Sequence, residues 1–147
     1  MDENKNMEFP LDLHYHSSNH MWAKKNDNGE VTVGIDALAL DSLGEIAYLS
    51  LKEVGTTVKK GETFGSLESA KMTTEIFSPV SGVISSLNES VEPNPHLINE
   101  HPYEGGWLMK LTPTDWDSES QSLISREAII EWSIAEVKRY EKENLFD

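Results

Sequence analysis

The stretch GSLESAKMTTEIFSPVSG, from Gly65 to Gly82, places a single lysine between two short strand patterns. TFGSL (Thr63 to Leu67) and TEIF (Thr74 to Phe77) have the composition of β-strands. The simplest connection between two such neighbours is a β-hairpin, and SAKM would form its tip. We therefore expect Lys71 at the end of a hairpin, with its whole side chain in water.

Short strand patterns, separated by glycine, proline and asparagine turns, recur along the rest of the chain. They lie at Val31–Ile35, Ile46–Leu51, Gly82–Leu87 and Trp107–Leu111, with a proline-rich segment between the last two that we expect to be a loop. Many short strands of this kind predict a mainly β fold, either a sandwich or a flattened β-barrel. At 147 residues, the chain is long enough for one domain with a buried core.

Two helices are expected beside the strands. Asp36 is a suitable N-cap and Gly44 a suitable C-terminal stop for a short helix near Asp36–Leu43. A longer amphipathic helix is expected from Ser125, as its N-cap, to the end of the chain at residue 147. Its apolar stripe consists of Ile130, Ile134 and Val137, widened by Ile129 and Trp132.

The composition excludes several classes of protein. Without cysteine, there can be no disulfide, thiolate nucleophile or cysteine-based metal site, so any redox chemistry must come from a cofactor. A net charge of −14 would repel a phosphate backbone, so we expect no nucleic-acid partner. The apolar runs are too short to span a membrane, and MDENKNMEFP at the start has no signal-peptide pattern. We therefore expect a cytoplasmic monomer that does not contact a membrane.

Spacing alone leaves two interpretations of Lys71. In the first, it is one of many exposed lysines, because hairpin tips often carry charge. In the second, its amine is offered to a modifying enzyme, and acylation would remove the charge and add a long arm. The local pattern does not decide between them.

Three histidines, His14, His16 and His20, gather near the start of the chain. Two histidines at i and i+2 on a strand share a face and could bind a metal. No carboxylate or third ligand stands at a dependable spacing, so we prefer a polar strand leading to Trp22 and expect no metal site. The chain also has no Gly-rich phosphate loop and no GxSxG motif.

Several segments, taken in order, resemble the H protein of the glycine cleavage system. They are FPLDLHYHSSNHMW, LGEIAYLSL, VGTTVKKGETFGSLESAK, SPVSGVI and LINEHPYEGGWLMKL. Glu68-Ser69-Ala70-Lys71 resembles the lipoylation site of that family, and the segment 99–107 resembles its characteristic ending. The resemblance implies a fold of the lipoyl or biotinyl carrier type, with lipoate joined covalently to Lys71.

The resemblance covers about residues 10–112, and together with the pattern of the flanking segments it divides the chain. We expect a flexible N-terminus over residues 1–9, a lipoyl-carrier domain over 10–112, a polar linker over 113–124 and a C-terminal helix over 125–147. In the family, the lipoyl arm takes an aminomethyl group from glycine decarboxylase, offers it to an aminomethyltransferase and is reoxidised by dihydrolipoamide dehydrogenase. The protein would therefore be a carrier without catalytic turnover of its own.

Roles for the residues around Lys71 follow from the same resemblance. A lipoate-protein ligase or lipoyl transferase would attach the cofactor. Four neighbours would shape what that enzyme recognises: Glu68, Ser69, Ala70 and Met72. Glu75 and the surface near Met21 and Ser42 would hold the loaded arm.

Four positions depart from the usual family pattern. Typical members have glutamate where Met21 stands, histidine where Ser42 stands, a small residue where Met72 stands and aspartate where Glu75 stands. Methionine at position 21 neither accepts a hydrogen bond from an amine nor balances its charge. These departures bear on the cargo more than on the arm itself.

Three alternatives therefore stay open. The first is an H-like lipoate-binding protein of bacterial sulfur oxidation, whose arm would carry sulfur to a heterodisulfide-reductase-like complex. The second is a biotin carrier, because biotin domains have methionine directly after the modified lysine, as Met72 follows Lys71. The third is an unmodified binding or regulatory module.

Overall fold

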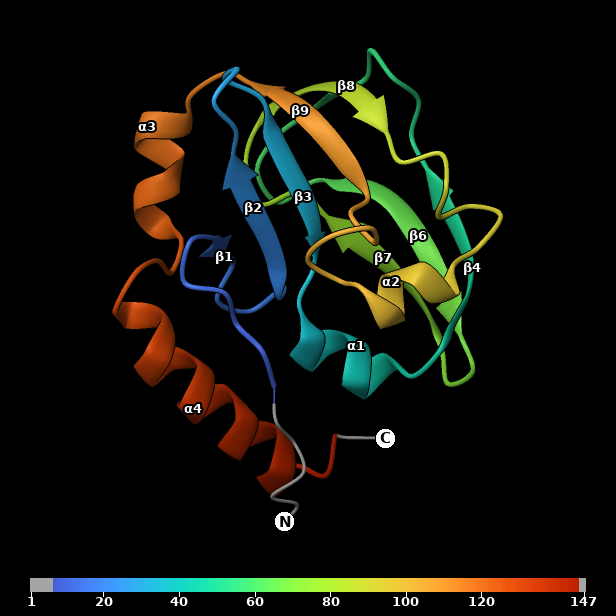
Figure 1. Ribbon diagram of the computed structural model, residues 1–147, viewed down its shortest axis with the longest axis vertical. Coiled ribbons are helices and arrows are strands. Elements are labelled where there is room, and N and C mark those ends of the chain that lie inside the picture. Colours follow the sequence, from blue (N-terminus) through green and yellow to red (C-terminus); the bar gives the residue numbers. More distant parts are fainter. Residues whose placement is uncertain (1–6, 146–147) are drawn as a thin grey trace.

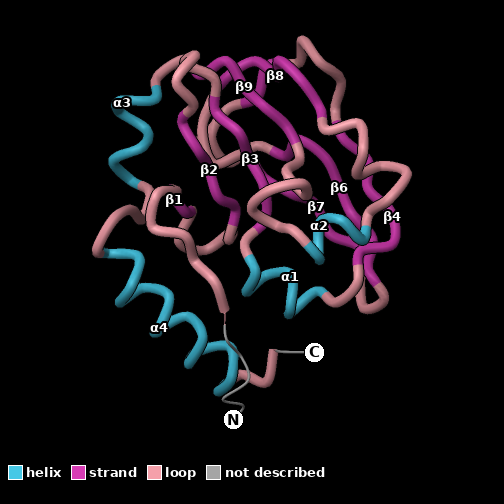
Figure 2. Tube along the Cα trace, in the orientation of Figure 1, coloured by secondary structure: helices cyan, strands magenta, loops and turns pink. Residues whose placement is uncertain are grey.

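A computed structural model describes residues 7–145 of the chain, and within them nine strands form two antiparallel sheets (Figures 1 and 2). The larger sheet has the strand order β1-β2-β3-β9-β8-β5, and the smaller has the order β4-β6-β7. The strands of the larger sheet are β1 (His14–Tyr15), β2 (Met21–Lys25), β3 (Val31–Ile35), β5 (Thr57–Val58), β8 (Gly82–Leu87) and β9 (Met109–Pro113). Those of the smaller sheet are β4 (Ile46–Leu51), β6 (Thr63–Ser69) and β7 (Thr73–Phe77). The mainly β fold is confirmed.

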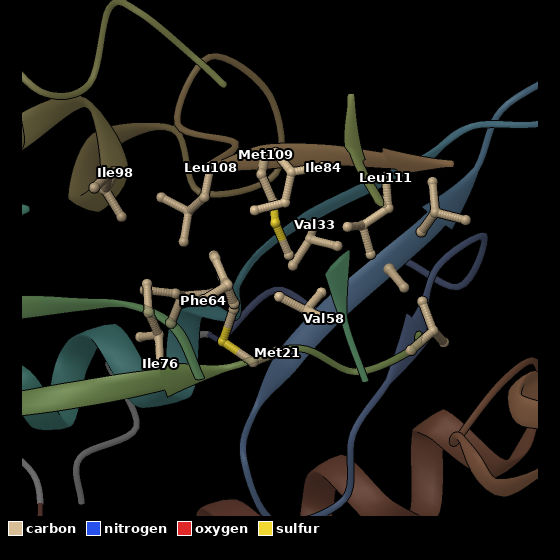
Figure 3. Close-up of a cluster of buried hydrophobic side chains, with 14 of the residues drawn as sticks. Met21, Val33, Val58, Phe64, Ile76, Ile84, Ile98, Leu108, Met109 and Leu111 are labelled. Atoms are coloured by element: carbon tan, nitrogen blue, oxygen red, sulfur yellow. The ribbon is translucent and has the colours of Figure 1, made fainter. Parts of the chain in front are cut away.

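The hydrophobic core lies between the two sheets (Figure 3). Val33, Ile84 and Leu111 come from the larger sheet and are buried. Phe64 and Ile76 come from the smaller sheet and are buried in the same cluster. Each such side chain contributes about 1.5–3 kcal/mol when it leaves water, so this cluster holds the sheets together.

The helix α1 (Ala37–Leu43) confirms the short predicted helix and its ends. Asp36 caps it by accepting a hydrogen bond from the backbone N–H of Ala39, and the N–H of Gly44 closes it on the carbonyl of Leu40. The proline-rich segment expected as a loop contains a second short helix, α2 (His96–Glu100). Asn99 ties α2 to the end of α1, because its amide donates to the carbonyl of Gly44 at 3.1 Å.

The segment predicted as a linker, residues 113–124, is folded onto the sheet. It contains α3 (Trp116–Glu119) and a 3-10 turn, η1 (Ser120–Ser122). Both carboxylate oxygens of Glu119 are used, since one accepts from the backbone N–H and the other from the hydroxyl of Ser81, each at 2.7 Å. This anchor, which joins residues 38 positions apart, has no local sequence signal.

The C-terminal helix α4 (Ala128–Lys142) is present, but two details of its prediction are wrong. Its N-cap is Glu127, which makes no side-chain cap bond, and not Ser125. Of the predicted stripe, Ile130 is 49% and Ile134 53% exposed and Val137 is half-buried, whereas Ile129 and Trp132, predicted at its edge, are the residues that pack inward. The buried residues of α4 are Ile129 and Tyr140.

The inward face of α4 mixes apolar and charged side chains, which explains the error. Ile129 joins a second cluster with Leu13, Tyr15 and Trp22. One turn further along, Trp132 stacks on His20, and Glu136 is bonded to the same histidine. A prediction that counts only apolar residues does not place Glu136 on the inward face. The glutamate can lie there because it is paired with His20.

The start of the described chain also packs against α4. Phe9 makes edge-to-face contacts with Tyr15 and Trp132, with ring centroids 5.7 and 5.5 Å apart. Of the predicted flexible segment, residues 1–6 lie outside the described residues, and Phe9 belongs to the packed structure. Among residues 7–145, no helix combines the length and the apolarity that a membrane crossing requires.

Candidate functional site

Lys71 lies at the tip of the β6–β7 hairpin, as the sequence predicts. The strands pair antiparallel up to Glu68 opposite Thr73, and Ser69 closes the ladder through its N–H, which donates to the carbonyl of Met72 at 2.8 Å. Ala70, Lys71 and Met72 follow and are exposed. The hairpin therefore presents the lysine at the surface.

Ser69 determines the shape of this tip. Its side chain is buried, and its hydroxyl oxygen accepts from the backbone N–H groups of Lys71 and Met72, each at 3.2 Å. The same hydroxyl donates to the carbonyl of Met72 at 3.3 Å. One small side chain thus satisfies the polar groups of the turn and fixes the backbone that carries the lysine.

The Lys71 side chain extends toward α1. Its Nζ donates to the backbone carbonyl of Ser42, in the last turn of that helix, at 3.0 Å. Lysine near the C-terminal end of a helix is favourable because the unsatisfied carbonyls there carry negative partial charge. The lysine therefore rests beside α1.

A pocket of about 190 Å³ lies between α1, β7 and the end of α4. We call it the α1–β7 pocket, and it is lined by Asn19, Met21, Ile35, Ala39, Ser42, Leu43, Thr74, Glu75, Ile76, Phe77 and Tyr140. The structure thus brings together Met21, Ser42 and Glu75, which the sequence analysis singled out from three distant segments. The lining is largely apolar, and Glu75 is the one carboxylate that the described residues contribute to it.

The other predicted site residues lie on the tip itself. Glu68, Ala70 and Met72 are exposed around Lys71, whereas Ser69 is buried beneath it. Glu75 lies further along β7, opposite Ser66 in the strand register. The predicted set therefore divides into a surface around the lysine and one residue in the pocket.

An ionic cluster centred on the buried side chains of His20 and Asp36 adjoins Tyr140, a residue of the α1–β7 pocket. Both ring nitrogens of His20 face carboxylates, with Nδ1 2.8 Å from Asp36 Oδ2 and Nε2 2.8 Å from Glu136 Oε1. Arg139 extends the chain of charges by donating to both oxygens of Glu136, at 3.0 and 3.1 Å. We call these residues the His20 cluster. Two carboxylates at the two nitrogens favour the doubly protonated imidazolium, which donates to both.

The pKa shifts of the His20 cluster agree with this arrangement. Burial disfavours the charged imidazolium, but the hydrogen bonds and charges of Asp36 and Glu136 outweigh it and raise the pKa of His20 above 6.5. Burial also raises the pKa of Asp36. Burial alone would raise the pKa of Glu136, yet its bonds to Arg139 and His20 lower it. The cluster therefore holds its shared proton more tightly than a free histidine does.

The other two N-terminal histidines do not join His20. The ring of His14 lies edge-on to Trp116, with centroids 4.9 Å apart, and His16 Nδ1 accepts from the N–H of Asn19 at 3.0 Å. Within the described part of the chain, no three histidine or acidic side chains gather closely enough to hold a metal ion. His16 and His14 therefore serve the local structure.

A protein-family model described as "Glycine cleavage H-protein" matches residues 13–135. The chain belongs to the glycine cleavage H-protein family. The H protein of Alcanivorax borkumensis is 48% identical to it over 118 residues, which cover 80% of this chain and 90% of that protein. The probable H protein of Thermococcus gammatolerans is 44% identical over 114 residues, covering 78% and 84% of the two chains.

A solved structure agrees with these sequence comparisons. The crystal structure of the glycine cleavage system H protein from Mycobacterium marinum superposes with a TM-score of 0.68 at 36% identity, covering 72% of this chain and 87% of that one. The chain is therefore a non-catalytic carrier of the glycine cleavage system, a lipoyl carrier of aminomethyl groups. Members of this family normally carry the lipoyl group on a lysine.

Sequence reasoning did not assign Glu136 and Tyr140 to the site, and it considered His20 only as one of three histidines that could bind a metal. His20 has a positive φ of 59°, so its side chain does not follow the in-and-out alternation of the residues of β2. Tyr140 and Glu136 belong to α4, whose docking face the apolar pattern did not identify. One weak signal exists, because Glu136 and Arg139 are spaced for an i,i+3 pair on one helix face.

Proposed function

We propose that Lys71 is the lipoyl attachment site of this carrier. The supporting observation is the position of Lys71 at the tip of a hairpin whose backbone is fixed by Ser69. From there the Lys71 side chain reaches Ser42, at the rim of the α1–β7 pocket. Attachment joins the Lys71 amine to the carboxyl of lipoate as an amide, which removes the lysine charge. A lipoate-protein ligase or lipoyl transferase would perform it.

The residues present fit a lipoyl arm. The arm is a long, mainly apolar chain, and the pocket beside the tip is lined chiefly by apolar side chains such as Ile35, Leu43 and Ile76. When attached, the lipoyl group supplies the disulfide that accepts and releases the cargo. The protein itself keeps the attachment point exposed and offers a sheltered surface next to it.

The remaining residues at the tip and in the pocket have two separate roles. Glu68, Ala70 and Met72 form the exposed surface that the attaching enzyme meets around Lys71. Glu75 supplies a carboxylate at the pocket, where it can attract the amine of an aminomethyl cargo. The partners of this cycle are glycine decarboxylase, the aminomethyltransferase and dihydrolipoamide dehydrogenase.

Attachment is tested by incubating the purified protein with a lipoate-protein ligase, lipoate and ATP, followed by intact mass measurement. We expect the mass of one lipoyl group on the wild type and none on Lys71→Arg or Lys71→Ala. Lys59→Arg, which alters an exposed lysine in the β5–β6 connection, is the matched control and accepts the group. Because Lys71 is exposed, its variants keep the wild-type unfolding transition within about 0.5 kcal/mol.

Three other outcomes would redirect the proposal. Lipoylation of Lys71→Arg refutes the site, and an unlabelled wild type supports an unmodified binding module. A biotin mass on the protein isolated from its own cells supports the biotin carrier. Reconstitution with the glycine cleavage enzymes then tests the cargo. A lipoylated protein that fails in this assay supports the alternative cargo, sulfur transferred to a heterodisulfide-reductase-like complex. The observation that favours this alternative is Met21 in the pocket.

A further inference from the structure

The α1–β7 pocket has a wall that the family match does not include. The matched family model ends at residue 135, and Glu136, Arg139 and Tyr140 follow it in the same helix, α4. Tyr140 lines the pocket and is only 9% exposed. The last turns of α4 therefore contribute to the pocket beside Lys71 through residues outside the matched region.

Tyr140 is held in place by the His20 cluster. Its ring meets His20 edge-on, with centroids 5.5 Å apart, while Trp132 stacks on His20 at 5.3 Å. The Arg139 guanidinium also lies 5.0 Å from the centre of the Tyr140 ring. The tyrosine ring thus contacts both a buried imidazole and an arginine, which restricts its motion.

The same cluster fixes the other walls of the pocket. His20 lies between Asn19 and Met21, two pocket residues of the chain leading into β2. Asp36, its first carboxylate partner, also caps α1, which supplies Ala39, Ser42 and Leu43 to the pocket. Glu136, its second partner, belongs to α4. One imidazole therefore joins three of the segments that enclose the pocket, and β7 encloses the remaining side.

From this arrangement we infer that Tyr140 is a positioning residue for the loaded arm: it completes the α1–β7 pocket and retains the cargo there. This inference rests on the proposed attachment to Lys71. An aromatic side chain over one side of a small pocket excludes water from a cargo that water can remove. The phenol oxygen is not required for that role, but the ring is.

The experiment compares the rate at which cargo is lost from the loaded protein. Lipoylated protein is reduced and then loaded with formaldehyde and ammonia, so that one carbon joins a thiol sulfur and the amine nitrogen and water leaves. Spontaneous loss of the aminomethyl mass is followed by intact mass spectrometry. Tyr140→Ala is expected to lose it several-fold faster than wild type, whereas Tyr140→Phe keeps the wild-type rate.

Ile134→Ala is the matched control, because Ile134 belongs to the same helix and is 53% exposed. It should lose cargo at the wild-type rate. Equal rates in Tyr140→Ala and wild type would overturn the inference. If Tyr140→Ala does not fold, Glu136→Gln takes its place, since it loosens the end of α4 without altering a pocket residue, and the same faster loss is required of it.

The two proposals fail in different ways. Absence of lipoylation in every variant is a failure of the attachment site. Full lipoylation together with an unchanged rate of cargo loss is a failure of the positioning role alone. A slower loss in Tyr140→Ala would also contradict the role, because it would mean that the ring hinders retention.

Discussion

The side chains of His20 and Glu136 are bonded at 2.8 Å although 116 residues separate them in the sequence. The bond attaches the C-terminal helix to the segment that begins β2. With Asp36 on the other nitrogen of the same ring, it also couples α4 to the N-cap of α1. One buried imidazole therefore helps to hold the end of α4 against the α1–β7 pocket.

Replacing His20 should loosen α4. We expect His20→Asn to lower the free energy of unfolding by about 3 kcal/mol, because the two carboxylates lose the cation between them. Asparagine tolerates the positive φ of 59° at this position, so backbone strain does not add to the effect. Chemical denaturation measures the change. His96→Asn, at an exposed histidine, is the control and should stay within about 0.5 kcal/mol of wild type.

The stability of the protein should fall as the pH rises above neutrality. Since the pKa of His20 is raised in the folded state, its stabilisation is complete below pH 6.5 and is lost as the pH passes the raised value. The raised pKa of Asp36 removes stability over a window that begins at pH 3.8, and the lowered pKa of Glu136 matters only as the pH falls below 4.5, so the decline above neutrality is assigned to His20. Urea unfolding at about pH 6 and about pH 9 tests this. A decline of equal size in His20→Asn would contradict the assignment.

Local patterns predicted the hairpin, but they could not predict what packs against it. Strand composition on both sides of SAKM, and the cap residues Asp36 and Gly44, act within a few residues of the backbone they determine, so the sequence reveals them. The docking face of α4 depends on Glu136 meeting His20, a contact between distant segments. A half-buried glutamate such as Glu136 cannot be told from a surface glutamate in the sequence until its partner is known.

The candidate site shows the same division. The place of Lys71 at a hairpin tip was predicted from its neighbours. Its role as attachment site, and the assignment of Met21, Ser42 and Glu75 to its surroundings, came from family resemblance. That these three line one pocket is a result of the fold. Tyr140 was missed because it is separated from Lys71 by most of the second half of the chain, and no short-range pattern connects them.

A methyl group at Gly34 should destabilise the larger sheet. Gly34 lies opposite Trp22 in the β2–β3 register, and a Cβ there would come within 2.5 Å of the indole ring. The ring is buried and its N–H donates to the carbonyl of Pro102 at 3.0 Å, so it cannot simply move aside. We expect Gly34→Ala to cost about 1–3 kcal/mol. Gly105→Ala, with no atom within 4 Å of the added Cβ, is the control in the same thermal unfolding assay.

The side-chain amide of Asn99 should stabilise the junction of α1, α2 and β4. Its oxygen accepts from the N–H of Ile46 at 2.9 Å while its nitrogen donates to the carbonyl of Gly44 at 3.1 Å. Asn99→Asp keeps the acceptor but places a carboxylate oxygen against that carbonyl. The expected loss is about 1–3 kcal/mol of unfolding free energy. Asn94→Asp, at an exposed asparagine just before α2, should change little, and equal losses in both variants would refute the argument.

The residue at position 21 should set how firmly the pocket holds an amine. Met21 is buried at the pocket, where its thioether has no charge and is only a weak hydrogen-bond acceptor for an aminomethyl cargo. Met21→Glu adds a carboxylate that can pair with the protonated amine, so spontaneous loss of cargo should slow several-fold. Because the substitution buries a polar group, it should also lower the free energy of unfolding by about 1–3 kcal/mol. Met21→Gln has the same shape without the charge and should lie close to wild type. If the glutamate and glutamine variants lose cargo equally fast, a charge at position 21 has no role in holding the amine.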